Sequence, residues 1–320
     1  MGNLQLVVWA LAPPLLVLTY YYRRVPAAPP LPTLLLCFVV GALSGLVALG
    51  LEWGFELLAN SVGDWDRITH TLPGVALRQM VEVGPIEEGS KLGGVILFQW
   101  KRSPPRHPST IFLYTIAIAL GFSAEENWVY FANGTASIID RLIGTPVHAL
   151  FSAPWGYALA VASGSTIRSG SDSRIVAKAW VNAIACHALV NVLSSAWRYS
   201  QPLHFLSYGL FPFLLWMFWR MEGLLQKVQR KSPIVLISGS TPIYRYWQMG
   251  LALFTLILGG NAIFGLFLLA RSLIPLSPSQ VFYPNFWLFL VSRFLLNVIP
   301  GLIAWGIYRY LLRQAYRHWQ

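Results

Sequence analysis

Residues 109–133 read STIFLYTIAIALGFSAEENWVYFAN, and this stretch decides the fold class. A membrane-spanning helix needs about 20 mostly apolar residues, and the stretch is long enough. It nevertheless contains two adjacent glutamates, Glu125 and Glu126. A charged side chain near the bilayer centre costs roughly 2.5–3.5 kcal/mol even on the more lenient insertion scales. We therefore expect a membrane helix whose carboxylates serve a function.

Ionisable side chains also occur in three further apolar stretches, as Glu87, Glu88, His148 and His187. Four ionised glutamates would cost on the order of 10 kcal/mol, comparable to the free energy of unfolding of a whole domain. Leucine would hold helices together without this cost. The pattern therefore indicates a polar reaction or transport centre inside a helical bundle.

Composition places the chain in a membrane. Of its 320 residues, 56% are hydrophobic and 11% are charged, and the mean hydropathy is +0.55. Soluble domains contain about 25% charged residues. We expect the net charge of +11 to come from cytoplasmic loops, with no nucleic acid as a partner. Cys37 and Cys186 both lie in apolar stretches and predict neither a structural disulfide nor redox chemistry.

We predict an all-α, polytopic transmembrane bundle with about nine spans. The predicted spans cover residues 4–21, 31–58, 75–99, 109–133, 141–163, 175–199, 203–219, 246–270 and 282–308. With the N-terminus outside and the C-terminus inside, 16 of the 23 Lys and Arg residues fall on the inner side, five on the outer side and two within spans. Basic loops mark the cytoplasmic side, so this bias supports an N-out, C-in topology.

The predicted spans form three regions along the chain. Residues 1–74 are expected to hold two transmembrane helices and an outer loop. Residues 75–199 form a four-helix catalytic core, and residues 200–320 form three transmembrane helices with a basic cytoplasmic loop at 220–245. No internal repeat is visible, so an inverted-repeat transporter is not indicated. We expect a multi-pass protein of the plasma membrane of a prokaryote.

The third predicted span contains GPIEEGSK at residues 84–91. On a helix, Lys91 lies one turn beyond both Glu87 and Glu88, at i+4 and i+3. The two glutamates point about 100° apart because a helix has 3.6 residues per turn. We therefore expect one carboxylate to pair with Lys91 and the other to face a cavity, a division that acid–base chemistry can use. Alternatively, the Glu–Lys pair only fixes helix packing.

The fourth predicted span contributes a second polar face. Glu126 and Tyr130 are four residues apart and share that face, and Asn127 follows directly after Glu126. We include these three as candidate site residues. Glu125 points elsewhere, and we expect it to be a packing or rim group.

The fifth and sixth predicted spans contribute histidines. His148 alone is a weak signal, because a lone buried histidine is more often a hydrogen-bonded core residue than a ligand. His187 and Asn191 are four residues apart and share a face, so the Asn191 amide could orient an imidazole, a substrate carbonyl or an oxyanion. Consecutive helices with short loops tend to be neighbours in space. We expect the four spans to place their polar groups around one cavity at the middle to outer leaflet.

These segments resemble the PrsW family of intramembrane proteases, within the wider group that includes the CAAX prenyl endopeptidases. The resemblance covers roughly residues 75–199 and rests on four motifs that occur in order. They are Glu87-Glu88-x-x-Lys91; Gly121-Phe122 with Glu126-Asn127 and Tyr130; Arg141 with Pro146 and His148; and His187-x-x-x-Asn191. The resemblance implies that the chain hydrolyses a peptide bond in a membrane protein or a lipid-anchored peptide.

The resemblance also implies catalytic roles for particular residues. Glu87 or Glu88 would be the general base that activates water, and Asn191 would be a supporting polar group. Lys91, Asn127 and Tyr130 would be further supporting residues of the site.

A metal centre is a second implication of the resemblance. His148 and His187 would bind a divalent metal such as zinc, or the tetrahedral intermediate, with Glu126 as a further ligand. A metal held by two histidines and a carboxylate, with one open position, can activate water and stabilise an oxyanion. The histidines lie on different predicted helices, however, and the sequence contains no His-Glu-x-x-His pair.

Three other functions fit parts of the pattern. Buried Glu, Lys and His side chains could form the relay of a proton- or cation-coupled transporter, and Gly84-Pro85 could break the third span. A b-type cytochrome could ligate haem through His148 and His187, but this function leaves the glutamates unexplained. A catalytically inactive scaffold or receptor could keep the same fold.

Overall fold

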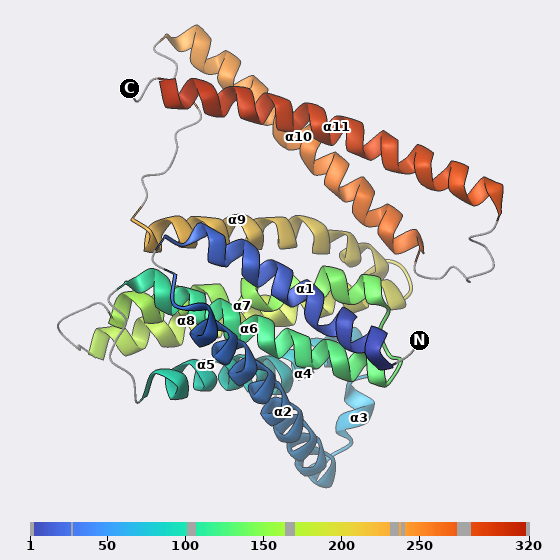
Figure 1. Ribbon diagram of the computed structural model, residues 1–320. Coiled ribbons are helices and arrows are strands. Elements are labelled where there is room, and N and C mark those ends of the chain that lie inside the picture. The colour runs from blue at the N-terminus through green and yellow to red at the C-terminus, as the bar shows by residue number, and fades with distance from the viewer. Residues whose placement is uncertain are drawn as a thin grey trace. The chain divides into compact units, whose positions relative to one another are not determined.

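A computed structural model describes residues 3–26, 28–100, 107–163, 170–230, 237, 241–273 and 283–317. The chain divides into two compact units, Met1–Lys231 and Ser232–Gln320. Within the described ranges the regular structure is helical, as Figure 1 shows, which agrees with the predicted all-α class.

The first unit contains nine α-helices and three short segments of other helix types among its described residues. They are α1 (Asn3–Arg24), α2 (Leu31–Val62), α3 (Trp65–Ile68), α4 (Leu72–Arg78), η1 (Gln79–Val83), α5 (Gly84–Trp100), α6 (Pro108–Ala132), α7 (Ile138–Ser163), α8 (Gly170–Ser195), η2 (Ala196–Arg198), η3 (Leu203–Gly209) and α9 (Leu210–Val228).

Helix α6, formed by the stretch quoted first, is the centre of the first unit. Every residue from Ser109 to Ala124 is buried, and the helix contacts α1, α2, α5, α7 and α9. An apolar helix that is covered on all sides needs no polar face, and this explains why the stretch is apolar all round. The surrounding helices thereby become neighbours of the two glutamates near its C-terminal end.

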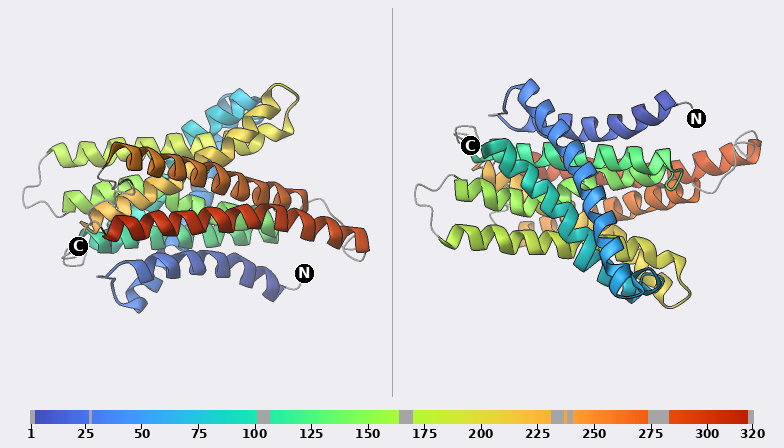
Figure 2. Two further views of the ribbon diagram at one scale, coloured as in Figure 1. Left: turned by 90° about the horizontal axis from the view of Figure 1, so that it is seen from above. Right: turned by 90° about the horizontal axis from the view of Figure 1, so that it is seen from below.

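Glycine sets the distance between α2 and α6. A Cβ on Gly41 would overlap the carbonyl oxygen of Ile118, and a Cβ on Gly121 would overlap the carbonyl oxygen of Phe38. The two backbones therefore touch directly, as small residues allow in membrane helix pairs. Helix α2 runs obliquely across α6 (Figures 1 and 2).

The third predicted span is built from three consecutive segments, α4, η1 and α5. Proline has no backbone N–H, so Pro85 cannot make the usual helical hydrogen bond. Directly before it, η1 is a π-helical turn in which the N–H of Gly84 bonds to the oxygen of Gln79, five residues back. Gly84-Pro85 therefore does not end the helix, and the wider turn changes the phase of the residues that precede Glu87.

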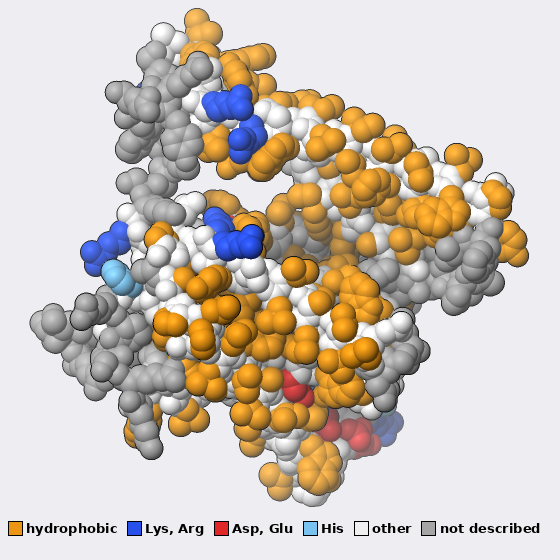
Figure 3. Space-filling model, viewed as in Figure 1, with side chains coloured by type: hydrophobic (Ala, Val, Ile, Leu, Met, Phe, Trp, Pro, Cys, Tyr) orange, Lys and Arg blue, Asp and Glu red, His pale blue; other side chains and the backbone are white. Residues whose placement is uncertain are grey.

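Six helices among the described residues are long and apolar enough to cross a membrane. They are Leu4–Arg24, Leu31–Val62, Pro108–Ala132, Ser173–Arg198, Pro242–Ala270 and Pro284–Ala315. The predicted third, fifth and seventh spans correspond to α5, α7 and α9, which lie outside this set. Hydrophobic side chains cover most of the visible surface of the first unit, with few charged groups among them (Figure 3).

The second unit contains helices α10 (Pro242–Leu273) and α11 (Pro284–Arg317). They pack against each other as an antiparallel pair, in which Gly259 faces Ala304 and Ala262 faces Gly301. A Cβ added at either glycine would lie 3.4 Å from the Cβ of the alanine that it faces. Small residues at these positions let the two helices approach closely.

Candidate active site

Helices α5, α6, α7 and α8 direct polar side chains into one cluster, which we call the polar cluster. Glu88 and Lys91 are fully buried, and the other members are buried or partly buried. Its members are Glu87, Glu88 and Lys91 from α5, Glu126 and Asn127 from α6, Arg141 and His148 from α7, and His187 from α8.

Lys91 lies at the centre of the polar cluster. Its Nζ is 3.1 Å from Glu87 Oε2, 2.8 Å from Glu88 Oε1 and 3.0 Å from His148 Nδ1. The ammonium also lies 4.1 Å from the centroid of the Phe122 ring, a favourable cation–π distance. The expectation that only one glutamate pairs with Lys91 is wrong. Both carboxylates are one turn away, and an ammonium has three N–H donors with which to reach them.

Glu88 is held firmly from α7. Its Oε2 accepts hydrogen bonds from Ser152 Oγ at 3.0 Å and from Trp155 Nε1 at 2.9 Å, while Oε1 accepts from Lys91. The sequence prediction did not include Ser152 and Trp155. Their spacing from His148, four and seven residues, places all three on one helix face and is the signal that could have found them.

Glu87 is held less tightly than Glu88. Its side chain keeps 9% exposure, whereas that of Glu88 has none. The hydrogen bond from Lys91 reaches Oε2. The two adjacent carboxylates thus occupy different environments. Hydrogen-bond donors enclose the carboxylate of Glu88, whereas that of Glu87 is partly exposed.

His148 is bonded through both ring nitrogens. Nδ1 faces Lys91 at 3.0 Å, and Nε2 is 2.6 Å from Glu126 Oε2. The same oxygen of Glu126 accepts from the Arg141 guanidinium at 2.5 Å. Arg141 therefore anchors the carboxylate that holds His148.

Asn127 and Tyr130 support this anchor. The Asn127 side-chain oxygen accepts from Arg141 Nε at 2.6 Å, and its amide donates to Thr145 Oγ1 at 3.0 Å. The Arg141 guanidinium lies 4.7 Å from the centroid of the Tyr130 ring. Glu126, Asn127 and Tyr130, the three candidates from α6, therefore all contact Arg141.

His187 enters the cluster from α8 and stacks on Phe151, with ring centroids 4.4 Å apart and planes 9° from parallel. Its Nδ1 is 3.7 Å from Glu88 Oε1, and its Nε2 is 3.9 Å from Glu87 Oε2. Nδ1 is buried and has no hydrogen-bond partner among the described residues. Both separations exceed the length of a direct hydrogen bond.

Asn191 turns away from the imidazoles. Its amide donates to the side-chain oxygen of Gln79 at 2.7 Å, in the π-helical turn that precedes α5. Asn191 therefore links α8 to the segment that carries the two glutamates.

A second group of charged residues, absent from the sequence prediction, surrounds η1. Glu82 is fully buried and accepts from Trp65 Nε1 at 2.7 Å and from Arg78 Nε at 3.3 Å. Arg78 also pairs with Glu56 of α2. Glu82 lies in the same predicted span as Glu87. A further glutamate within an apolar span was therefore the signal that could have found it. These bonds tie the start of the segment that carries Glu87 and Glu88 to α2 and α3.

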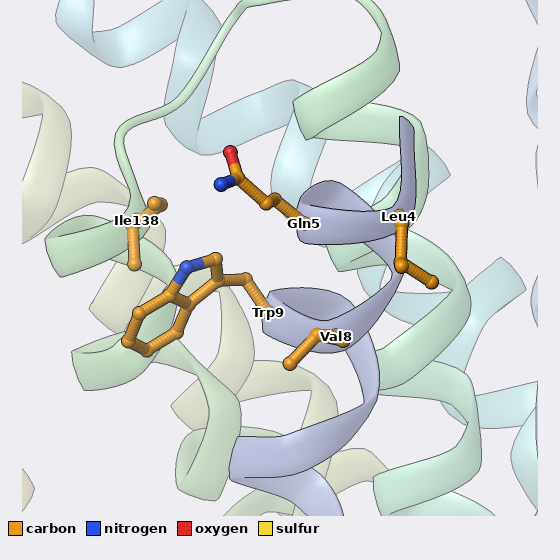
Figure 4. A pocket seen from close by; sticks show the side chains of 5 residues that line it. All are labelled: Leu4, Gln5, Val8, Trp9 and Ile138. Carbon is orange, nitrogen blue, oxygen red and sulfur yellow. The ribbon is translucent and has the colours of Figure 1, made fainter. Parts of the chain in front are cut away.

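A pocket lies between the first turns of α1 and the start of α7 (Figure 4). It is lined mainly by apolar side chains, namely Leu4, Gln5, Val8, Trp9 and Ile138. The oxygen of Ala10, one residue beyond Trp9, accepts from the Asn127 amide at 3.4 Å. The turn of α1 that lines the pocket is thus hydrogen-bonded to Asn127 of the polar cluster, although no cluster member lines the pocket.

Comparison with known proteins identifies the family. The model of the PrsW family of intramembrane metalloproteases matches residues 29–217, more than half of the chain. The chain belongs to the PrsW family. "Protease PrsW" from Shouchella clausii (strain KSM-K16) is 24% identical over 225 residues, which cover 68% of this chain and 96% of that protein. No solved structure gives a significant match.

The PrsW assignment confirms the prediction from the four motifs. The matched range begins before α2, ends within α9 and includes every member of the polar cluster. Together with the apolar helices, it shows that the chain is an integral membrane protein and a membrane protease.

The family description names a metalloprotease, but the described donors do not fit a zinc site. His148 Nε2 and Glu126 Oε2 are only 2.6 Å apart, whereas two ligands of one tetrahedral zinc lie about 3.3 Å apart. The other nitrogen of His148 faces the Lys91 ammonium, which repels a metal cation. Among the described residues, no group of three or more His, Cys, Asp and Glu side chains is arranged to hold a metal ion.

Proposed function

We propose that the chain hydrolyses a peptide bond in a membrane-associated protein by means of water activated by Glu87 and Glu88. The observation that supports this most is the burial of both carboxylates beside the His187 imidazole, whose Nδ1 has no hydrogen-bond partner in the part of the chain that the structure describes. A water hydrogen-bonded to Glu87, Glu88 and His187 would have two carboxylate acceptors and one further polar partner.

Glu87 is the better candidate for the general base. Glu88 already accepts from Lys91, Ser152 and Trp155, so its lone pairs are largely committed. Glu87 would take a proton from the water as the oxygen attacks the substrate carbonyl carbon, and would then deliver that proton to the leaving amine. Glu88 would hold the water in position.

His187 is the candidate for stabilising the oxyanion. In the tetrahedral intermediate, negative charge develops on the carbonyl oxygen, and a buried N–H donor stabilises that charge more strongly than water does. Stacking on Phe151 fixes the plane of the ring. Lys91 would contribute its positive charge at short range while remaining bonded to both glutamates.

We also propose that α5, α7 and α9 cross the bilayer with the six apolar helices. This gives nine spans with the N-terminus outside and the C-terminus inside. Support comes from the distribution of the 23 Lys and Arg residues. Residues 75–199 would form the catalytic core, and the cell membrane of a prokaryote suits a chain whose matched relative is bacterial. The substrate would be a membrane protein or a lipid-anchored peptide.

The test uses the full chain in proteoliposomes with internally quenched peptides that each contain one hydrophobic span. We expect the wild type to cleave at least one peptide, with products identified by mass spectrometry. Glu87→Gln should lower kcat by about 10²–10⁴-fold, the usual contribution of a general base. Glu125→Gln, which changes another glutamate outside the polar cluster, is the matched control. Equal rates for Glu87→Gln and wild type would contradict the proposal.

A further inference from the structure

We propose that Lys91 is a positioning residue that holds His148 as a neutral imidazole with its proton on Nε2, and that His187 is therefore the histidine able to act on the substrate. The inference rests on the proposed function for its catalytic part. Its structural part, the protonation of His148, stands independently of proteolysis.

The first step is a count of the donors of Lys91. An ammonium has three N–H donors and no acceptor. Three acceptors lie within hydrogen-bond distance of Nζ, on Glu87, Glu88 and His148. Each donor therefore has one partner, which satisfies a fully buried cation.

The second step fixes the tautomer of His148. Because Lys91 can only donate, Nδ1 of His148 must present a lone pair to it. The ring proton then lies on Nε2, which points at Glu126 Oε2 at 2.6 Å. This oxygen is also bonded to Arg141. A proton on Nδ1 would place two N–H groups against each other at 3.0 Å.

The third step is the contrast with His187. The two rings lie close together, with centroids 6.2 Å apart. His187 nevertheless has a buried nitrogen without a partner among the described residues, beside the two carboxylates. Buried polar atoms are nearly always bonded, so an unbonded one in a hydrolytic site points to contact with water or substrate. One imidazole is thus a fixed part of the scaffold, and the other is available for the reaction.

The direct test is ¹⁵N NMR of the full chain labelled at histidine, in detergent micelles at pH 7.5. The His148 signals are assigned by their loss in His148→Gln. We expect the wild-type signals of an unprotonated Nδ1 and a protonated Nε2. In Lys91→Met, we expect Nδ1 to gain a proton, because the donor that faced it is gone while Glu87 and Glu126 remain nearby. Lys178→Met, which removes an exposed lysine from α8, is the matched control.

A second variant keeps the test decisive if Lys91→Met does not fold. In Glu126→Gln, Lys91 is intact, so we expect Nδ1 of His148 to stay unprotonated. A protonated Nδ1 in the wild type would overturn the proposal. So would an unprotonated Nδ1 in folded Lys91→Met, or a switch of tautomer in Glu126→Gln.

Kinetics distinguish positioning from a merely structural role. With a cleaved peptide, Lys91→Met should lower kcat by about 10- to 100-fold, as is typical when a supporting hydrogen bond is lost, with KM unchanged. Lys91→Arg should recover part of the rate, because guanidinium also only donates. A fall in the amount of folded protein without a change in kcat would overturn the catalytic part of the proposal. If no variant of Glu87 affects cleavage, the proposed function fails while the NMR result for His148 still stands.

Discussion

The polar cluster and the hairpin of α10 and α11 show two ways of packing helices in one chain. In the hairpin, glycine and alanine bring the two backbones together at Gly259, Ala262, Gly301 and Ala304. In the polar cluster, helices meet through buried charges, which are expensive in lipid unless each is paired. Small residues alone suffice for close packing, so buried charges that only held helices together would add a cost without a benefit. This contrast supports the proposal that catalysis takes place in the polar cluster, and we expect substitutions in the two regions to have very different effects.

Among the tests of this comparison, His187→Ala is expected to have the largest effect on the rate of cleavage. Loss of the donor that would stabilise the oxyanion should reduce kcat by about 10²–10³-fold. The rate is measured on a cleaved single-span peptide in proteoliposomes. His204→Ala removes a histidine of η3, outside the polar cluster, and should leave the rate near that of wild type. Equal activity of both variants would remove His187 from the mechanism.

A smaller effect, on stability, is expected where α2 and α6 touch. Gly121→Ala places a methyl group against the carbonyl oxygen of Phe38, which is backbone and cannot move alone. The free energy of unfolding should fall by about 1–3 kcal/mol, as for other overpacked sites. Thermal unfolding in detergent measures it. Gly50→Ala, where the added methyl meets open space, is the control. The same loss for both variants would contradict the close contact.

Substitutions in the hairpin should barely change catalysis. Gly265→Leu would collide with Asn297 and disturb the packing of α10 on α11, whereas Gly260→Leu meets open space. Because α10 and α11 carry no member of the polar cluster, we expect both variants to cleave the peptide within about two-fold of the wild-type rate. Loss of cleavage in Gly265→Leu alone would show that the hairpin takes part in the reaction, and would end the contrast between the two regions.

The smallest effect is expected from metal removal. Lys91 is the cation that lies among the carboxylates, and in the proposed tautomer His148 has no lone pair free for a metal. Treatment with EDTA or 1,10-phenanthroline should therefore leave the initial rate unchanged, while a zinc peptidase treated in parallel loses activity. Reversible inhibition that added zinc relieves would show that a metal centre forms by rearrangement of these side chains.

Local spacing explains what the sequence could predict. Residues three or four apart share a helix face, so the sequence predicted that Lys91 pairs with a glutamate one turn away, although not that it contacts both Glu87 and Glu88. The shared face of Glu126 and Tyr130 follows from the same spacing. Four motifs in chain order were specific enough to predict the PrsW family, which the family match confirms.

Contacts between helices could not be predicted in the same way. The pairing of Arg141 with Glu126 and the two donors to Glu88 depend on how far each helix slides and rotates against its neighbours. That register is set by packing such as the contact at Gly121. The π-helical turn changes the helical phase before Glu87, so an ideal helix could not predict that Asn191 bonds to Gln79.

The most direct test of the central claim is an experimental structure of the full chain in lipid nanodiscs that resolves the side chains of α5, α7 and α8. We expect Lys91 Nζ about 3 Å from Glu88 and from His148 Nδ1, with His187 beside both glutamates. The proposal would be contradicted if Lys91 lay more than about 6 Å from both groups, too far for even one bridging water, with the carboxylates and imidazoles directed to separate helix contacts.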